Sequence, residues 1–203
     1  MTSITLPRSK TPSGAAYHAA GSGEVLLLIH GVGLSLDVWV PQIEQFVSSH
    51  RVVAVDLPGH GQSAALTSKT EIQHYVAWLD RFIDELECGP VNLCGHSMGA
   101  MMTMGLGVTY PRQTLRVAML CGVFRRSLSA QKAVQARAVL IAQGENNSQG
   151  PLDRWFDVRG RAERRRVVVA GHGRDAVWKA GQDGAVGLLD VVDVLAAPQR
   201  RVP

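Results

Sequence analysis

The chain has 203 residues, of which 46% are hydrophobic and 19% are charged, and its formal net charge is +4. This length and composition fit one ordinary globular domain with a sizeable core and exclude a disordered chain. No apolar run approaches the roughly 20 residues that span a bilayer, and residues 1–13 lack the apolar segment of a signal peptide. An odd number of cysteines (Cys88, Cys94 and Cys121) favours a reducing compartment. We therefore expect a cytoplasmic protein without disulfides.

Strands and helices alternate along the sequence. Residues 15–20 predict a first strand near the edge of a sheet. Continuous apolar runs, which are typical of strands buried on both faces, predict strands at 25–30 and 51–56. Two further strands are predicted at 90–94 and 115–121. Helical spacing of apolar residues predicts helices at 36–48, 72–86, 97–110 and 128–143. This order predicts an α/β fold, with a mainly parallel sheet and helices on both of its faces.

The composition changes near residue 157. From Arg159 to Pro203 the chain has no Ser, Thr, Ile, Phe, Tyr, Asn, Cys or Met, and Arg, Val, Gly and Ala are frequent. We therefore predict a folded core over 14–157 and an atypical, poorly ordered tail over 158–203. A shifted reading frame or a misassembled gene end would explain the bias, because the residues that remain have GC-rich codons. The alternative is a biased tail that belongs to the gene.

One segment fits the G-x-S-x-G pattern: Gly95-His96-Ser97-Met98-Gly99. It joins a predicted strand to a predicted helix, which is the setting that the motif requires. A serine on such a sharp turn is exposed at the carboxyl end of the sheet, and glycines give the strand and the helix room to approach. The start of a helix also favours developing negative charge. The pattern predicts Ser97 as a nucleophile, with the side chain of His96 diverging from it.

A glycine-rich loop follows the first buried strand. It consists of His30, Gly31, Val32 and Gly33. An oxyanion hole needs hydrogen-bond donors that are fixed where negative charge develops during acyl transfer. We predict that the N–H groups of Val32 and Met98 form this hole, and that His30 has a structural role in the loop.

Three motifs occur in this order: HGVG at 30–33, DLPGHGQS at 56–63 and GHSMG at 95–99. Together they resemble the α/β-hydrolase superfamily, and within it the group of small esterases, enol-lactonases and carbon–carbon bond hydrolases. The resemblance covers roughly residues 14–156. It implies the α/β-hydrolase fold, a small-molecule ester or lactone as partner, and no metal or organic cofactor. It also implies an acid and then a histidine further along the chain.

The chain departs from the family pattern after its serine. The only later histidine is His172, and the candidate acid, Asp175, comes after it, which reverses the family order. An apolar run at 167–170 and a glycine precede both residues, and one short loop makes it hard for His172 to bridge Asp175 and Ser97. We therefore expect an incomplete triad, a C-terminal truncation or frame shift, and last strands that are missing or degenerate. Turnover should then be weak or absent.

The predicted function is that of a serine hydrolase acting on a carboxylic ester or lactone by nucleophilic acyl transfer. Two alternatives are a carbon–carbon bond hydrolase of the same fold and a catalytically silent binding module that keeps the pocket. A third is nucleic-acid binding through the arginines at 159–166. Charge runs of this kind are usually solvated segments, so we expect neither a nucleic-acid nor a membrane partner. The sequence leaves the oligomeric state open.

Overall fold

A computed structural model describes residues 6–67, 71–123, 127–143 and 169–171. The chain divides into two compact units, one formed by residues 1–122 with 165–203 and the other by residues 123–164. The predicted boundary at 157 lies outside the described residues.

The first unit contains a sheet with helices. Its described strands are β1 (Ser9–Lys10), β2 (Ala16–Ala20), β3 (Val25–Ile29), β4 (Arg51–Val55), β5 (Val91–His96), β6 (Thr114–Leu120) and β7 (Val169–Gly171). Its described helices are the 3₁₀ helix η1 (Leu36–Trp39), α1 (Val40–Phe46), α2 (Ile72–Glu85), α3 (Met98–Thr109) and the 3₁₀ helix η2 (Pro111–Gln113). The second unit contains α4 (Leu128–Ala142).

The described strands form one mixed sheet in the order β1-β2-β4-β3-β5-β6-β7. β4, β3, β5 and β6 are parallel to one another, whereas β1 and β2 are antiparallel at one edge. The carboxyl ends of the parallel strands therefore meet at one end of the sheet, where side chains that follow them come together. The predicted α/β fold is confirmed. β3 is buried along its whole length and β4 in all but its first residue, whereas β6 is only partly buried.

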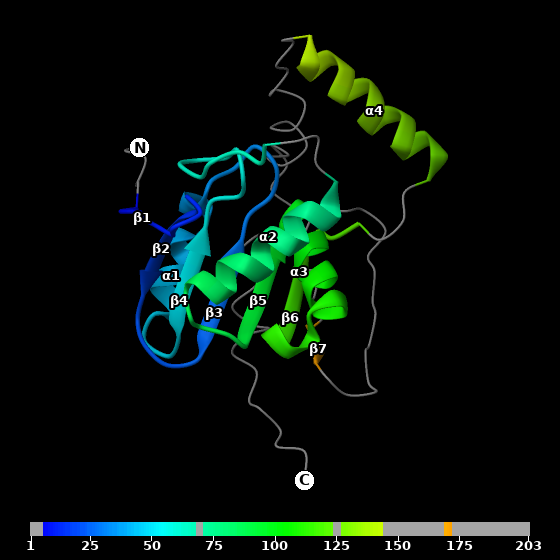
Figure 1. Cartoon of the computed structure of the whole chain (residues 1–203). Helices are drawn as coiled ribbons and strands as arrows, with labels where there is room; N and C mark the ends of the chain where they lie inside the picture. Colours follow the sequence, from blue (N-terminus) through cyan, green and yellow to red (C-terminus); the bar gives the residue numbers. More distant parts are fainter. Residues whose placement is uncertain (1–5, 68–70, 124–126, 144–168, 172–203) are drawn as a thin grey trace, which may run out of the picture. The chain divides into compact units, whose positions relative to one another are not determined.

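Helices cover both faces of the sheet (Figure 1). Successive side chains of β3 point to opposite faces of the sheet. Because helices cover both faces, β3 is buried along its whole length. Leu27 and Ile29 pack with α2 and α3 on one face, and Leu26 and Leu28 pack with η1 and α1 on the other. These two cores explain why the strand is an unbroken apolar run with no alternation of polar residues.

β7 occupies the edge of the sheet beyond β6. It pairs antiparallel with β6, so that Gly171 lies opposite Arg116 and Val169 lies opposite Ala118. β7 has three residues and overlaps the apolar run at 167–170. It lies at the edge where we expected the last strands to be missing or degenerate.

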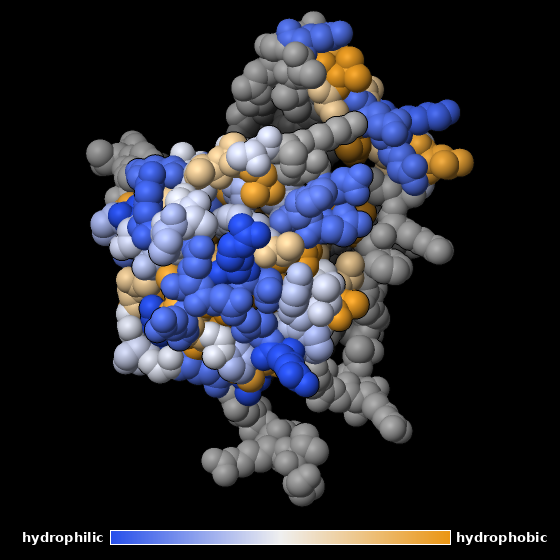
Figure 2. Space-filling model, viewed as in Figure 1, coloured by the Kyte–Doolittle hydropathy of each residue, from blue (hydrophilic) through white to orange (hydrophobic). Residues whose placement is uncertain are grey.

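The surface that α2 presents is mostly polar, with scattered apolar residues (Figure 2). None of the helices in the described part of the chain combines the length and apolarity needed to cross a bilayer. The three cysteines all lie in that part, and none of them forms a disulfide. The cytoplasmic location stays a prediction.

Candidate active site

Ser97 occupies a single-residue turn between β5 and α3. Its backbone has φ 56° and ψ −110°, a region that L-residues rarely adopt and that costs of order 1–3 kcal/mol. The Ser97 N–H donates to the carbonyl of Leu120 at the end of β6, over 2.8 Å. The strained turn is therefore anchored to the neighbouring strand, and it lies at the carboxyl end of the sheet.

Two glycines make this turn possible. A Cβ on Gly95 would overlap the backbone of Gly99, and a Cβ on Gly99 would overlap the carbonyl oxygens of Ile29 and His30. The strand, the turn and the first turn of α3 are thus packed backbone against backbone. Glycine at both positions of the motif is required by this close approach.

The loop at 30–33 lies directly against Ser97. A Cβ on Gly31 would stand 3.0 Å from the Cβ of Ser97, and Gly33 has φ +76°. Val32 is 64% exposed. Met98 is the first residue of α3, so its N–H has no acceptor within its own helix. The assignment of the Val32 and Met98 N–H groups as oxyanion donors stays a prediction.

His30 is completely buried at the end of β3 and makes hydrogen bonds through both ring nitrogens. Its Nε2 accepts the N–H of Leu57 over 3.0 Å, so the proton sits on Nδ1 and is donated to the Gly31 carbonyl over 2.7 Å. Burial lowers the pKa of His30 to about 4, which keeps the ring neutral at physiological pH.

This lowered pKa predicts a loss of stability in mild acid. The unfolded chain binds a proton at His30 near pH 6.5 and the folded chain only near pH 4, so protons favour the unfolded state between these values. We expect the free energy of unfolding to fall by about 3 kcal/mol over this range through His30. Urea unfolding at several pH values measures it.

The control for this prediction is His30→Asn, which removes the titrating ring. The pKa of His96 is also lowered by burial, so His96 too makes the chain less stable in acid, both in the wild type and in the variant. The variant should therefore show a shallower dependence on pH. An identical dependence in the two proteins would contradict the assignment to His30.

Asp56, at the end of β4, is a buried carboxylate that joins three segments. Its Oδ1 accepts the N–H of Leu36 over 2.8 Å. Its Oδ2 accepts the N–H of Gln62 over 3.0 Å and the Nε–H of Arg8 over 2.8 Å.

Arg8 joins Asp56 to a second carboxylate. Its side chain is 4% exposed, and its Nη2 binds Asp37 over 2.5 Å. Burial alone would raise the pKa of Asp37, but hydrogen bonds, above all from Arg8, hold it below its usual value. The loops on either side of Asp56 are thus fixed by one ion-pair network.

This network was not predicted from the sequence, where Asp56 is only the last residue of a predicted strand and the first residue of the motif at 56–63. An acidic residue that ends an apolar strand is a signal that could have singled out Asp56. Its partner Arg8 could not have been found, because the two residues are 48 positions apart.

The predicted base and acid of the triad, His172 and Asp175, lie outside the described residues. The last described residue before them in the sequence is Gly171, which pairs with Arg116 near the start of β6. Ser97 is hydrogen-bonded to Leu120, at the C-terminal end of β6. Within the described ranges no histidine is hydrogen-bonded to the Ser97 hydroxyl. The same ranges contain no group of three or more His, Cys, Asp or Glu side chains placed to hold a metal ion.

The ring of His96 packs beside the same loop. Its Nδ1 is buried without a hydrogen-bond partner and lies 3.1 Å from the position of a Cβ on Gly31. Gly31 thus lies against both the Ser97 turn and this imidazole, so a larger residue at position 31 would displace one of them.

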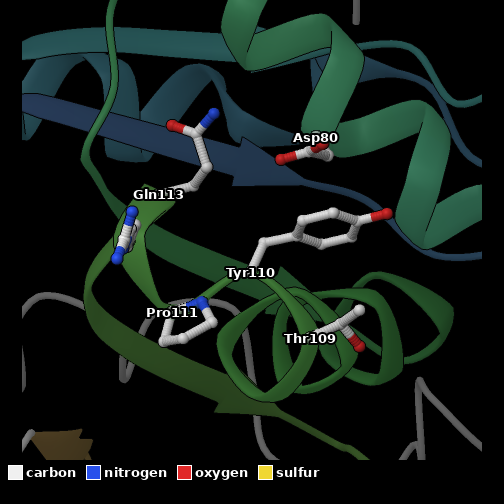
Figure 3. Close-up of a pocket in the computed structure, with 6 residues that line it drawn as sticks. Asp80, Thr109, Tyr110, Pro111 and Gln113 are labelled. Atoms are coloured by element: carbon white, nitrogen blue, oxygen red, sulfur yellow. The ribbon is translucent and has the colours of Figure 1, made fainter.

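A shallow hollow of about 530 Å³ lies beside the C-terminal end of α3 (Figure 3). It is lined by Asp80, Thr109, Tyr110, Pro111, Arg112 and Gln113. Because α3 runs from Met98 to Thr109 and Ser97 precedes it, the hollow lies at the far end of that helix and is separate from Ser97. It is not part of the candidate active site.

A strained serine between a parallel strand and a helix, beside a glycine-rich loop, defines the nucleophile elbow of the α/β-hydrolase fold. The sequence profile of the family described as alpha/beta hydrolase fold matches residues 24–147, and the chain belongs to this family. The predicted resemblance is confirmed.

Two similar proteins have names that describe different activities, one of a hydrolase and one of an acetyltransferase component. The chain is 46% identical over 156 residues to (E)-2-((N-methylformamido)methylene)succinate hydrolase of Acinetobacter baylyi, a match that covers 77% of this chain and 59% of that protein. It is 37% identical over 103 residues to the dihydrolipoyllysine-residue acetyltransferase component of the acetoin cleaving system of Cupriavidus necator, covering 51% of this chain and 28% of that one. The chain thus spans less than two thirds of the length of either relative.

Solved structures give the same fold. A hydrolase from Pseudomonas aeruginosa superposes with a TM-score of 0.64 at 25% identity, over 80% of this chain and 64% of the other. A thermophilic esterase from Thermogutta terrifontis gives a TM-score of 0.62 at 22% identity, over 70% and 56% of the two chains. The second similarity concerns the fold alone.

Proposed function

We propose that Ser97 is the nucleophile of an acyl-transfer reaction on a carboxylic ester or lactone. The observation that carries this proposal is the backbone of Ser97 at φ 56° and ψ −110°, held between β5 and α3. Such strain persists only where the surroundings enforce it, and here it presents an alcohol at the carboxyl end of the sheet. The Ser97 oxygen attacks the carbonyl carbon, and the leaving alcohol departs from the tetrahedral intermediate to give an acyl-serine.

The oxygen of that intermediate would lie between the N–H groups of Val32 and Met98. Contact of Gly31 with Ser97 brings the first donor close to the reacting atom, and the start of α3 supplies the second together with the helix dipole. Removing one donor of this kind typically costs about 2.7–4 kcal/mol of the barrier.

The proton of Ser97 needs a base, and the buried His30 does not fit that role. Its two ring nitrogens are engaged by Gly31 and Leu57. None of the described histidines is hydrogen-bonded to the Ser97 hydroxyl, and a serine that lacks its base is expected to retain only roughly 10³–10⁴-fold catalysis over water. We therefore propose slow acylation and still slower hydrolysis of the acyl-serine by this chain.

A second candidate substrate is an amide-bearing unsaturated dicarboxylate. The 46% identity with the Acinetobacter baylyi protein favours it, because the name of that protein describes a succinate with an N-methylformamido-methylene group. The reaction would use the same serine and the same oxyanion donors. Comparison of this compound with simple esters as substrates distinguishes the two candidates.

The test is the acylation of the chain by a short-chain nitrophenyl ester, followed by intact-mass measurement and peptide mapping. We expect a single acyl group that accumulates on Ser97, because deacylation also needs a base. Ser97→Ala should lose it, whereas Ser48→Ala, at an exposed serine after α1, should retain it. Equal acylation of the wild type and Ser97→Ala would overturn the proposal and favour a silent binding module.

A further inference from the structure

The hydrogen bond from His30 to Gly31 acts on the same peptide unit that carries the proposed oxyanion donor. The carbonyl of Gly31 and the N–H of Val32 belong to one planar trans peptide, so they point in opposite directions. His30 Nδ1–H donates to that carbonyl over 2.7 Å. The direction of the Val32 N–H is therefore coupled to the imidazole.

The imidazole itself is held rigidly. It is fully buried, its Nε2 accepts the N–H of Leu57 over 3.0 Å, and its ring meets that of His60 edge-on, with the centroids 5.5 Å apart. Leu57 directly follows Asp56, whose carboxylate accepts the N–H of Leu36 at the other end of the loop. The loop from Gly31 to Leu36 is thus fastened at both ends to residues that follow β3 and β4.

The Gly31 carbonyl also accepts the N–H of Leu34 over 3.3 Å, so the bond from His30 is the shorter of two that orient this peptide. Gly31 and Gly33 flank Val32, and glycine adopts both signs of φ at little cost. The side chain of Val32 is exposed and provides no anchor in the core. Rotation of the peptide between Gly31 and Val32 would turn the N–H away from Ser97 without disturbing the sheet.

We propose that His30 is a positioning residue that sets the orientation of the Gly31–Val32 peptide and so aims the Val32 N–H at the oxyanion. The importance of this for catalysis rests on the proposed acyl-transfer role of Ser97. The orientation of the peptide, however, can be measured without any reaction.

Two substitutions separate the two hydrogen bonds of His30. The amide of asparagine stands as many bonds from Cα as Nδ1, so His30→Asn can still donate to the Gly31 carbonyl while losing the bond to Leu57. The amide of glutamine stands as far out as Nε2, so His30→Gln can still accept the Leu57 N–H while losing the bond to Gly31. Each variant removes one buried hydrogen bond, so the two form a matched pair for stability.

The first readout is the rate at which a fluorophosphonate labels Ser97 in the full chain. We expect His30→Gln to label about 10²–10³-fold more slowly than the wild type, the usual effect of losing an oxyanion donor, and His30→Asn to stay within about tenfold of the wild type. The free energy of unfolding should fall by similar amounts in both. Equal slowing of the two variants, or slowing that follows stability, would overturn the positioning role.

The second readout does not depend on a reactive serine. Long-range ¹H–¹⁵N spectra of the wild type should show His30 protonated at Nδ1 and not at Nε2, and the Val32 amide should give one sharp signal. That signal should broaden or double in His30→Gln and stay single in His30→Asn. A proton on Nε2 in the wild type, or an unchanged Val32 signal in His30→Gln, would overturn the inference. If the wild type is not labelled at all while these spectra appear as expected, the proposed function fails and the peptide orientation stands.

Discussion

Gly99→Ala is expected to destabilise the chain by about 3 kcal/mol or more, at the upper end of the penalties for overpacking. The added Cβ would overlap the carbonyl oxygens of Ile29 and His30. These are backbone atoms at the end of β3 and cannot rotate away as a side chain can. Urea unfolding followed by circular dichroism measures the loss.

Gly107→Ala, in the same helix, is the matched control. A Cβ at Gly107 would meet only side-chain methyl groups, of Val117 at 3.3 Å and Thr114 at 3.9 Å. Alanine also favours the helical state over glycine by about 0.8–1.0 kcal/mol. This variant should be as stable as the wild type or more stable. A similar loss in both variants would show that the backbone contact at Gly99 is not as tight as described.

Arg8→Met is expected to lower the free energy of unfolding by about 3–5 kcal/mol, because it leaves the completely buried carboxylate of Asp56 without its cation. The N–H groups of Leu36 and Gln62 would still bind this carboxylate but would not neutralise it. The loops on either side of the candidate site should loosen as a result. Chemical unfolding near neutral pH measures the effect.

Arg116→Met is the control for this prediction. Arg116 also contacts a carboxylate, that of Glu24, over 2.6 Å, but the two side chains are 40% and 41% exposed. Pairs of this kind contribute at most about 1 kcal/mol. Comparable losses in the two arginine variants would mean that the Arg8 network is no more important than a surface ion pair.

The strands and the sharp turn at Ser97 could be predicted because their signals are local. An unbroken apolar run such as Val25–Ile29 is enough to indicate a strand buried on both faces. Gly95 and Gly99 around Ser97 indicate a sharp turn through their spacing alone. In both cases neighbouring residues carry the whole pattern, and no distant partner has to be known.

The parts that could not be predicted depend on partners far apart in the sequence. His30 was expected to be structural, but its acceptor role toward Leu57 joins residues that are 27 positions apart. The antiparallel direction of β7 against β6 likewise follows from pairing across the sheet, which an apolar run alone does not specify. His172 and Asp175 stay predictions for the same reason, since order along the chain does not fix distance to Ser97.

A crystal structure of the chain after reaction with a fluorophosphonate tests the central claim most directly. We predict a phosphorus atom bonded to the Ser97 oxygen, with one phosphoryl oxygen about 2.7–3.1 Å from the N–H groups of both Val32 and Met98. An adduct on another residue, or a phosphoryl oxygen turned away from both amides, would contradict the assignment of this turn as a nucleophile elbow with its oxyanion hole.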